Sequence, residues 1–234
     1  MAARYRLFDI GWILATNLLV LAGVIAWGWP PGNVFLLFWI ENAVLGAITA
    51  VRIATAQGPA AQPPGPKSIL RFPRWGRVAF FVVHYGIFAV VHLVFVGLIA
   101  VGAGVSWSFW ALGLPAVLIG LRYAVDLAGG WFAGRQRFAT NAEQAFWSPY
   151  PRLIVLHVAT LLGFAFATPP GGASQASWLA ALAPVRAWFD ALGYPISDGA
   201  VLVALLMVLK TIADLAMIRR GTPRDLQVSM DLGR

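Results

Sequence analysis

The sequence contains no cysteine. This absence excludes disulfides, thiolate metal sites, iron–sulfur clusters and thiol nucleophiles, because each of them requires a cysteine sulfur. Charge is also scarce, since only 11% of the 234 residues are Asp, Glu, Lys or Arg, whereas 60% are hydrophobic. A soluble domain of this size cannot cover its surface with so few charges, so the composition indicates an integral membrane protein.

Several motifs of membrane enzymes and metal sites are missing as well. Gly-x-Ser-x-Gly does not occur, which disfavours a rhomboid-type serine protease. Neither His-x-x-x-His nor His-Glu-x-x-His occurs, so no pair of histidines has the spacing of a metal site within one helix. The sequence therefore carries no strong signature of a particular chemistry, and whether the protein is an enzyme stays undecided.

Long apolar runs are what the chain has in abundance. Six of them have about 18–25 residues, the length that a hydrocarbon core of roughly 30 Å requires. They lie at about 8–29, 33–55, 78–102, 107–132, 151–168 and 199–218. The first run follows Arg4 and Arg6 but is too long for a signal peptide, so we expect an uncleaved span. These runs predict an all-α fold, with one transmembrane domain over residues 1–220 and a disordered tail over 221–234.

Lysine and arginine are distributed very unevenly around these runs. Fourteen of the 17 cations fall on one predicted side of the membrane, and Arg186 alone falls on the other. The fourteen are Arg4, Arg6, Arg52, Lys67, Arg71, Arg74, Arg77, Arg135, Arg137, Arg152, Arg219, Arg220, Arg224 and Arg234. This bias predicts that both termini are cytoplasmic, in a bacterial inner membrane. We therefore expect the net charge of +8 to contact anionic lipids on that side and not to bind nucleic acid.

Two connections have a recognisable pattern. Thr140 and Glu143 have the spacing of a capping box, which predicts a short surface helix after them. On the opposite side, apolar residues between positions 178 and 192 recur at helical spacing. That pattern predicts an interfacial amphipathic helix, bent at Pro184, that lies on the membrane.

Few ionisable residues fall inside the predicted spans, and each of them requires an explanation because a charge is costly in hydrocarbon. The charged residues and histidines at least four residues from a span end are Glu41, His84, His92, Arg122, Asp126, His157, Lys210 and Asp214. Counting about 1.5 Å per residue from the middle of each span places Glu41, His92 and Lys210 near the midplane. Such groups must face one another, water or a ligand, so we expect a polar site within the bundle.

The histidines suggest a metal site without defining one. His84 and His92 are separated by about 12 Å of rise and about 80° of rotation, so they cannot both bind one ion. One of them, together with His157 or Glu41 from another helix, would suit a transition metal such as zinc or iron. A heme between His84 and His157 is a less favoured reading. Equally, each histidine can simply hydrogen-bond a neighbouring helix.

The remaining charges can pair with one another. Lys210 lies at the depth of Glu41, so it is the expected partner of that carboxyl group. Lys210 and Asp214 are spaced i, i+4, as are Arg122 and Asp126, and each pair can form on one helix face. We expect Arg122 and Asp126 to form a structural ion pair near the cytoplasmic edge.

Four short motifs resemble a family of small polytopic bacterial and archaeal membrane proteins with no assigned function. They are Phe38-Trp39-Ile40-Glu41-Asn42, His84-Tyr85-Gly86 with His92, Leu156-His157, and Leu209-Lys210 with Asp214-Leu215. This resemblance implies a multi-span fold and draws attention to these positions, but it implies no activity.

A weaker similarity is to the intramembrane CAAX-processing and bacteriocin-processing glutamate proteases. Glu41, Phe88 with His92, and His157 follow one another in the order of the motifs of that family. However, Asn42 stands where a second Glu is expected, and Leu161 stands where a polar residue is expected. The oxyanion partner is therefore missing, which disfavours this activity.

Three kinds of function stay open at this point. The first is an intramembrane site that binds a transition metal through Glu41, His84, His92, His157, Lys210 and Asp214. The second is a proton-coupled transporter or channel that uses the same residues as a relay. The third is a non-enzymatic assembly or scaffold subunit of the membrane. Whether the protein forms a homo-oligomer also stays open.

Overall fold

The structure, a computed structural model, describes residues 2–59, 68–167, 183–193 and 197–220. These residues form helices and short connections, and there is no strand among them, which confirms the predicted all-α fold. The long helices are α1 (Ala2–Ala26), α2 (Pro31–Thr55), α3 (Arg74–Ala103), α4 (Leu114–Val125), α6 (Tyr150–Ala167) and α9 (Asp198–Arg220). The π-helical turns η2 (Phe109–Gly113) and η3 (Asp126–Ala133) extend α4 at its two ends. The short elements are η1 (Ile69–Arg71), η4 (Gln136–Phe138), α5 (Ala142–Trp147) and α8 (Ala183–Ala191).

Proline and glycine set several of the helix limits. Pro31 is the first residue of α2, where its missing N–H would have no partner within the helix anyway. Gly28, with a φ of 65°, turns the chain between α1 and α2. Gly104, with a φ of 79°, ends α3 in a conformation that side chains rarely adopt. The connections from α1 to α2 and from α3 to η2 are therefore short.

Five helices in the described part of the chain are long and apolar enough to cross a membrane. They are Leu7–Ala26, Pro31–Thr55, Arg74–Ala103, Phe109–Ala133 and Gly199–Ala216. The chain is accordingly a multi-pass membrane protein. The sixth predicted span, 151–168, coincides with α6, which packs against α2, α3 and α9. A total of six spans stays a prediction, because span 151–168 extends to residues outside the described ranges.

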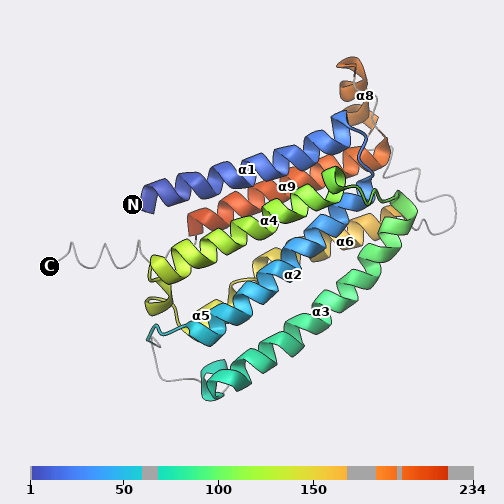
Figure 1. The fold of residues 1–234 in the computed structure, drawn as a ribbon. Coiled ribbons are helices and arrows are strands. Elements are labelled where there is room, and N and C mark those ends of the chain that lie inside the picture. Colours follow the sequence, from blue (N-terminus) through green and yellow to red (C-terminus); the bar gives the residue numbers. More distant parts are fainter. Residues whose placement is uncertain (1, 60–67, 168–182, 194–196, 221–234) are drawn as a thin grey trace.

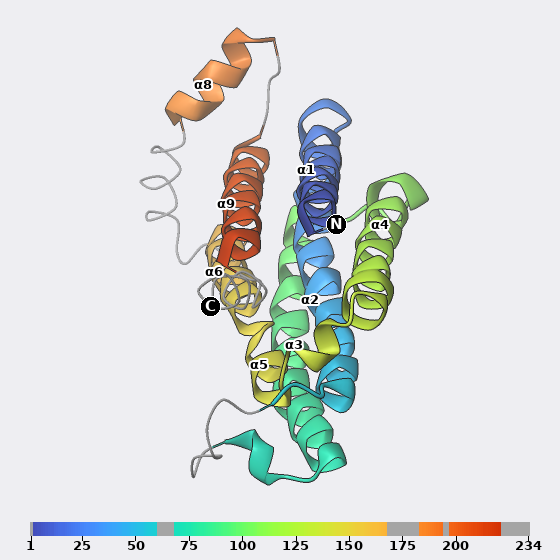
Figure 2. The ribbon, with the colours of Figure 1, turned by 90° about the vertical axis from the view of Figure 1, so that its left-hand side faces the viewer.

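Helix α2 lies in the middle of the bundle (Figures 1 and 2). It contacts α3 on one side and α4, α6 and α9 on others, while α1 packs against α4 and α9. Figure 1 shows α1, α3 and α6 beginning at the end of the bundle where α2, η3 and α9 finish. We call this the basic end, because most of the cations in the described connections gather there, and we call the other the far end.

The bundle buries several polar side chains within its apolar core and exposes many large apolar side chains. Its buried polar side chains include Asn17, Asn33, Glu41, Asn42, Thr49, His92, Thr160, Lys210 and Asp214. Helix α3, by contrast, exposes large apolar side chains along most of its length, among them Val82, Val83, Ile87, Val90, Val91 and Val94. Such an arrangement suits hydrocarbon surroundings, in which polar groups must be satisfied within the protein.

The predicted capping box differs in its residues, and the predicted amphipathic helix lies partly outside the described ranges. The capping box is formed by Asn141 and Gln144, one residue later than predicted, because Glu143 instead accepts a hydrogen bond from Ser68. Of the amphipathic helix predicted between 178 and 192, the structure describes Ala183–Ala191 as helical. The tail over 221–234 lies outside the described residues.

Candidate functional site

The centre of the bundle holds a lysine between two carboxyl groups. Lys210 Nζ lies 2.9 Å from Glu41 Oε2 and 2.6 Å from Asp214 Oδ2. Its third proton points at Asn17 Oδ1, at 3.4 Å. An ammonium group has three donors, so all of them have acceptors here. Both expected contacts of Lys210, with Glu41 across helices and with Asp214 one turn away, are confirmed.

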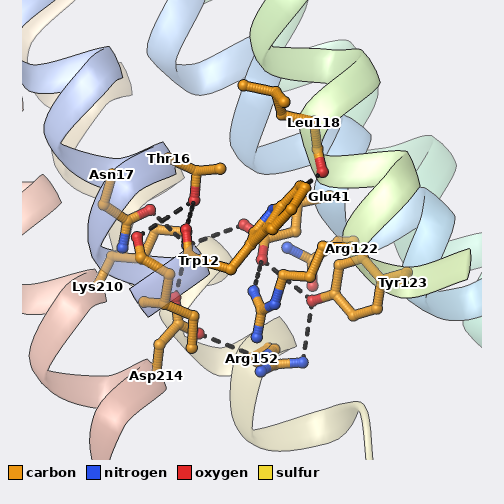
Figure 3. A network of polar contacts seen from close by, with 12 residues as sticks. Trp12, Thr16, Asn17, Glu41, Leu118, Arg122, Tyr123, Arg152, Lys210 and Asp214 are labelled. Atoms are coloured by element: carbon orange, nitrogen blue, oxygen red, sulfur yellow. Dashed lines mark hydrogen bonds and ion pairs between the residues drawn. The ribbon is translucent and has the colours of Figure 1, made fainter. Parts of the chain in front are cut away.

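Two further side chains close these contacts into a ring (Figure 3). Arg152 Nε donates to Asp214 Oδ1 at 3.2 Å, and Arg152 Nη1 donates to the Tyr123 hydroxyl at 2.9 Å. The Tyr123 hydroxyl in turn donates to Glu41 Oε1 at 3.0 Å. The polar ring thus consists of Glu41, Lys210, Asp214, Arg152 and Tyr123, which come from α2, α9, α6 and α4. Its two cations balance its two carboxylates, so the ring has no net charge.

Arg122 lies beside the polar ring without being part of it. Its Nη1 is 3.6 Å from Glu41 Oε1, and its guanidinium lies 5.2 Å from the centre of the Tyr123 ring. Within the described residues, the guanidinium donates no hydrogen bond, although it carries five N–H groups. The side chain is only 11% exposed. Arg122 is therefore a nearly buried cation with most of its donors unused.

Two clefts meet at the Glu41–Lys210 ion pair. The first is lined by Phe38, Glu41, Asn42, Arg152, Val155, Leu156, Lys210, Ala213 and Asp214. The second is lined by Thr16, Asn17, Val20, Leu37, Phe38, Glu41, Pro115, Ile119, Arg122, Met207 and Lys210. Only Phe38, Glu41 and Lys210 line both.

The two clefts extend in opposite directions along the helices. Helix α9 runs toward the basic end, so Asp214 lies on the basic side of Lys210 and Met207 lies on its far side. The first cleft reaches Asp214 and the second reaches Met207. We therefore call them the basic-end cleft and the far-end cleft. Glu41 and Lys210 lie between them.

Two of the histidines form a separate pair. His92 Nε2 is 3.0 Å from His157 Nδ1, and His92 Nδ1 is 2.7 Å from the carbonyl oxygen of Phe88. Because a carbonyl only accepts, Nδ1 of His92 carries a proton. With both rings neutral, His157 Nδ1 donates to His92 Nε2, which leaves Nε2 of His157 as an acceptor. His92 is buried, whereas His157 is exposed on the surface of α6.

His84 belongs to neither group. Its ring is stacked on Phe80, with centroids 5.6 Å apart and an interplanar angle of 9°, and it lies near Phe88, Phe146 and Tyr150. His84 does not join the other candidate site residues among the described side chains, because it lies eight residues, about two helical turns, before His92 on α3 and contacts Phe146 of α5. An aromatic cluster takes up its ring there.

The polar ring and the histidine pair lie on different sides of α2. Trp39 donates its indole N–H to the carbonyl of Ala89 on α3, while Glu41 faces α4 and α9. Positions two apart on a helix are about 200° apart, so these side chains point in nearly opposite directions. In the described part of the chain, no three His, Asp or Glu side chains are grouped so that they could hold a metal ion. The site that joins Glu41 to His92 and His157 is therefore not formed.

The predicted ion pair of Arg122 and Asp126 is also replaced. Asp126 accepts from Arg52 Nη2 at 2.5 Å, and Arg122 approaches Glu41 instead. Both new partners come from α2, which packs along α4. Since the chain becomes π-helical at Asp126, the regular i, i+4 geometry ends at the residue that the prediction required. Each charge then pairs across the helix contact.

The whole chain was compared with known proteins. A family described as a family of unknown function, DUF6498, matches residues 1–229. The chain belongs to this family. No curated protein and no solved structure matches it. The match includes the polar ring, Arg122 and the histidine pair, and it agrees with the predicted resemblance to an uncharacterised family.

Sequence reasoning missed three residues of the site. Tyr123 carries no charge, and Asn17 is a single polar residue in an apolar run. Neither residue therefore stands out in the sequence as part of a polar site. Arg152 was counted only as a cation flanking a span. Arg152 is the third residue of α6, after Tyr150-Pro151. This position indicates a site residue, because a long cationic side chain near a helix end can extend along the helix toward buried carboxylates.

Proposed function

We propose that the protein is a proton-coupled transporter or channel in which Glu41 carries the proton and Lys210 is its counter-ion. One observation carries the proposal. The Glu41–Lys210 pair is the polar contact at which the basic-end cleft and the far-end cleft meet. A titratable group that lies between clefts on its two sides can exchange a proton with either of them, as proton transfer across a membrane requires.

The contacts around Glu41 allow its charge to change without leaving a bare cation. When Glu41 takes up a proton, Lys210 keeps Asp214 and Asn17 as acceptors. The Tyr123 hydroxyl can then turn from Glu41 while it still accepts from Arg152. The polar ring thus has a second arrangement, in which the broken contacts are the Glu41–Lys210 ion pair and the hydrogen bond from Tyr123 to Glu41.

The two other hypotheses have less support. A transition-metal site requires several ligands on one ion, and among the residues that the structure covers the histidines and Glu41 lie in different contacts. A scaffold subunit would be consistent with the complete pairing within the polar ring. It does not account for clefts on both sides of that ring, however, or for the unused donors of Arg122.

The placement in the membrane is part of the proposal. We infer that the basic end faces the cytoplasm in a bacterial inner membrane, where its arginines contact anionic lipid headgroups. The basic-end cleft would then connect Glu41 to the cytoplasmic side, and the far-end cleft would connect it to the outer side.

Proton influx into vesicles tests the function. We expect purified protein in proteoliposomes containing pyranine to acidify the lumen when a potassium diffusion potential is applied. Glu41→Gln should reduce this influx by at least about tenfold, because the amide cannot release a proton. The measurement is the initial rate of pyranine fluorescence change.

The matched control is Glu143→Gln, the same chemical change at a carboxyl that accepts from Ser68 outside the clefts. It should leave the influx unchanged. Wild-type influx no faster than that of protein-free vesicles would overturn the proposal, as would equal influx in wild type and Glu41→Gln. Unaltered thermal unfolding of Glu41→Gln shows that the variant is folded.

A further inference from the structure

We infer that the far-end cleft binds a small carboxylate with an apolar tail, and that Arg122 is the group that holds its carboxylate. This inference rests on the proposed function, because it names the substrate class of the same site. It starts from the unused hydrogen-bonding capacity of Arg122 and from the composition of the cleft that this residue lines.

Arg122 has one ion-pair partner, Glu41 at 3.6 Å, which it shares with Lys210 and Tyr123, and it donates no hydrogen bond among the described residues. The polar ring is neutral by itself, so Arg122 adds one positive charge beside it. Glu41 Oε1, at 3.6 Å, already accepts from Tyr123, while the other carboxylate oxygen accepts from Lys210. Asp9 on α1 is near enough for electrostatic interaction with Arg122, but no ion pair joins them among the described side chains. A buried guanidinium in this state is an anion-binding group, and its planar fork fits a carboxylate.

The far-end cleft has a polar end and an apolar wall. Arg122, Lys210, Asn17 and Thr16 gather at the level of Glu41. The rest of the lining is apolar: Val20, Leu37, Phe38, Pro115, Ile119 and Met207. Inorganic phosphate would leave this wall without contacts, whereas a short alkyl or aryl chain would bury against it. The cleft therefore favours an amphipathic carboxylate over a fully polar anion.

Binding of such an anion would be linked to the proton on Glu41. A carboxylate on Arg122 lies next to Glu41 Oε1, and two adjacent carboxylates repel each other unless one of them is protonated. The other charged groups around Glu41 are Lys210 and Asp214 on α9 and Arg152 on α6. Asp9 on α1 lies near Arg122. Anion and proton would then enter the site together, which is the coupling that a proton symporter needs.

Butyrate is the probe for this site, and butyramide is its uncharged counterpart of the same shape. We expect butyrate to raise the unfolding temperature of the detergent-solubilised protein in a saturable manner, and butyramide to leave it unchanged. Phosphate should have a weaker effect than butyrate. Arg122→Gln should weaken butyrate binding by about tenfold or more, as expected for the loss of a charge-assisted hydrogen-bonded pair. Arg122→Lys should fall in between.

The control variant is Arg137→Gln, which removes the same charge from a side chain that stacks on Phe132 and Phe138 outside the clefts. It should bind butyrate like the wild type. Glu41→Gln should bind butyrate more tightly than the wild type, and calorimetry in two buffers should show proton uptake on binding only in the wild type. Equal binding of butyrate and butyramide would overturn the inference, as would unchanged binding in Arg122→Gln. Since binding is measured without a membrane gradient, its failure is distinct from a failure of proton influx.

Discussion

At the scale of single residues, the polar ring makes the bundle sensitive to unbalanced charge. Lys210 donates hydrogen bonds to both Glu41 and Asp214, while Arg152 donates to Asp214 and Tyr123. All of these side chains are nearly buried, so each charge depends on a partner and not on water. The loss of one charge should therefore matter more than the loss of two that oppose each other.

Lys210→Met tests this dependence. It leaves Glu41 and Asp214 without their shared cation and should lower the free energy of unfolding by about 3–5 kcal/mol. The double variant Lys210→Met with Glu41→Gln should regain part of that loss, since one of the two uncompensated carboxylates is gone. Chemical unfolding of all four proteins gives the coupling energy, expected at about 1–3 kcal/mol. Strictly additive losses would contradict the pairing.

The histidine pair is organised differently from the polar ring. His92 contacts a carbonyl of its own helix and His157. Of the four ring nitrogens of the pair, Nε2 of the exposed His157 is the one without a partner among the described residues. The pair therefore needs no counter-charge while both rings are neutral. This explains how two histidines can lie in a membrane helix contact without a metal ion or carboxylate beside them.

At the scale of elements, the contact between α2 and α3 depends on a small residue. A Cβ at Gly46 would lie 2.6 Å from Tyr85 Cε1, and the Tyr85 hydroxyl donates to the Asn42 carbonyl on α2. The Tyr85 ring thus occupies the space that Gly46 leaves open. Close approach of helices at glycine is common in membranes, where association depends on packing and hydrogen bonds.

Gly46→Ala should push Tyr85 away and lower the free energy of unfolding by about 1–3 kcal/mol. The same substitution at Gly86 on α3, where an added Cβ would meet no atom within 4 Å, provides the control. Gly86→Ala should be neutral or slightly stabilising because it favours the helix. Unfolding of both variants under identical detergent conditions measures the difference, and equal stability would disprove the close packing.

Helix α2 also explains why polar residues at one depth do not form one site. Its Trp39 side faces α3, and its Glu41 side faces α4 and α9. Residues of α3 and α9 at the same depth in the membrane are therefore separated by α2. His92 and Lys210 were predicted at one depth, but they lie on opposite sides of that helix.

At the scale of the whole molecule, the absence of cysteine makes the topology easy to test. Gln57 follows the end of α2 at the basic end, and Ser197 precedes the start of α9 at the far end. A single cysteine introduced at either position would be the only thiol in the protein. In intact bacterial cells, a membrane-impermeant maleimide should label Ser197→Cys at once and Gln57→Cys only after permeabilisation. This expectation follows from the proposal, based on the uneven distribution of cations, that the basic end faces the cytoplasm. The reverse labelling would invert the proposed orientation, and equal labelling from both sides would disprove a single orientation.

Much of the fold could be predicted because it follows from local rules. The runs at 33–55, 78–102 and 107–132 correspond closely to α2, α3 and the helix Phe109–Ala133, since length and hydropathy alone determine which segments can cross a bilayer. The Lys210–Asp214 pair was predictable for the same reason: both residues are on one helix at a spacing that brings them together.

The sequence by itself therefore determined the class of the protein, its apolar helices and the small set of residues that must be satisfied inside them. Only the tertiary structure decided which residues meet. Tyr123 and Arg152 belong to the polar ring, His92 contacts His157, and Asp126 forms an ion pair with Arg52. The physical reason is that hydropathy reports the depth of a residue, whereas its partners depend on the rotation and neighbours of each helix, which no spacing along a single chain contains.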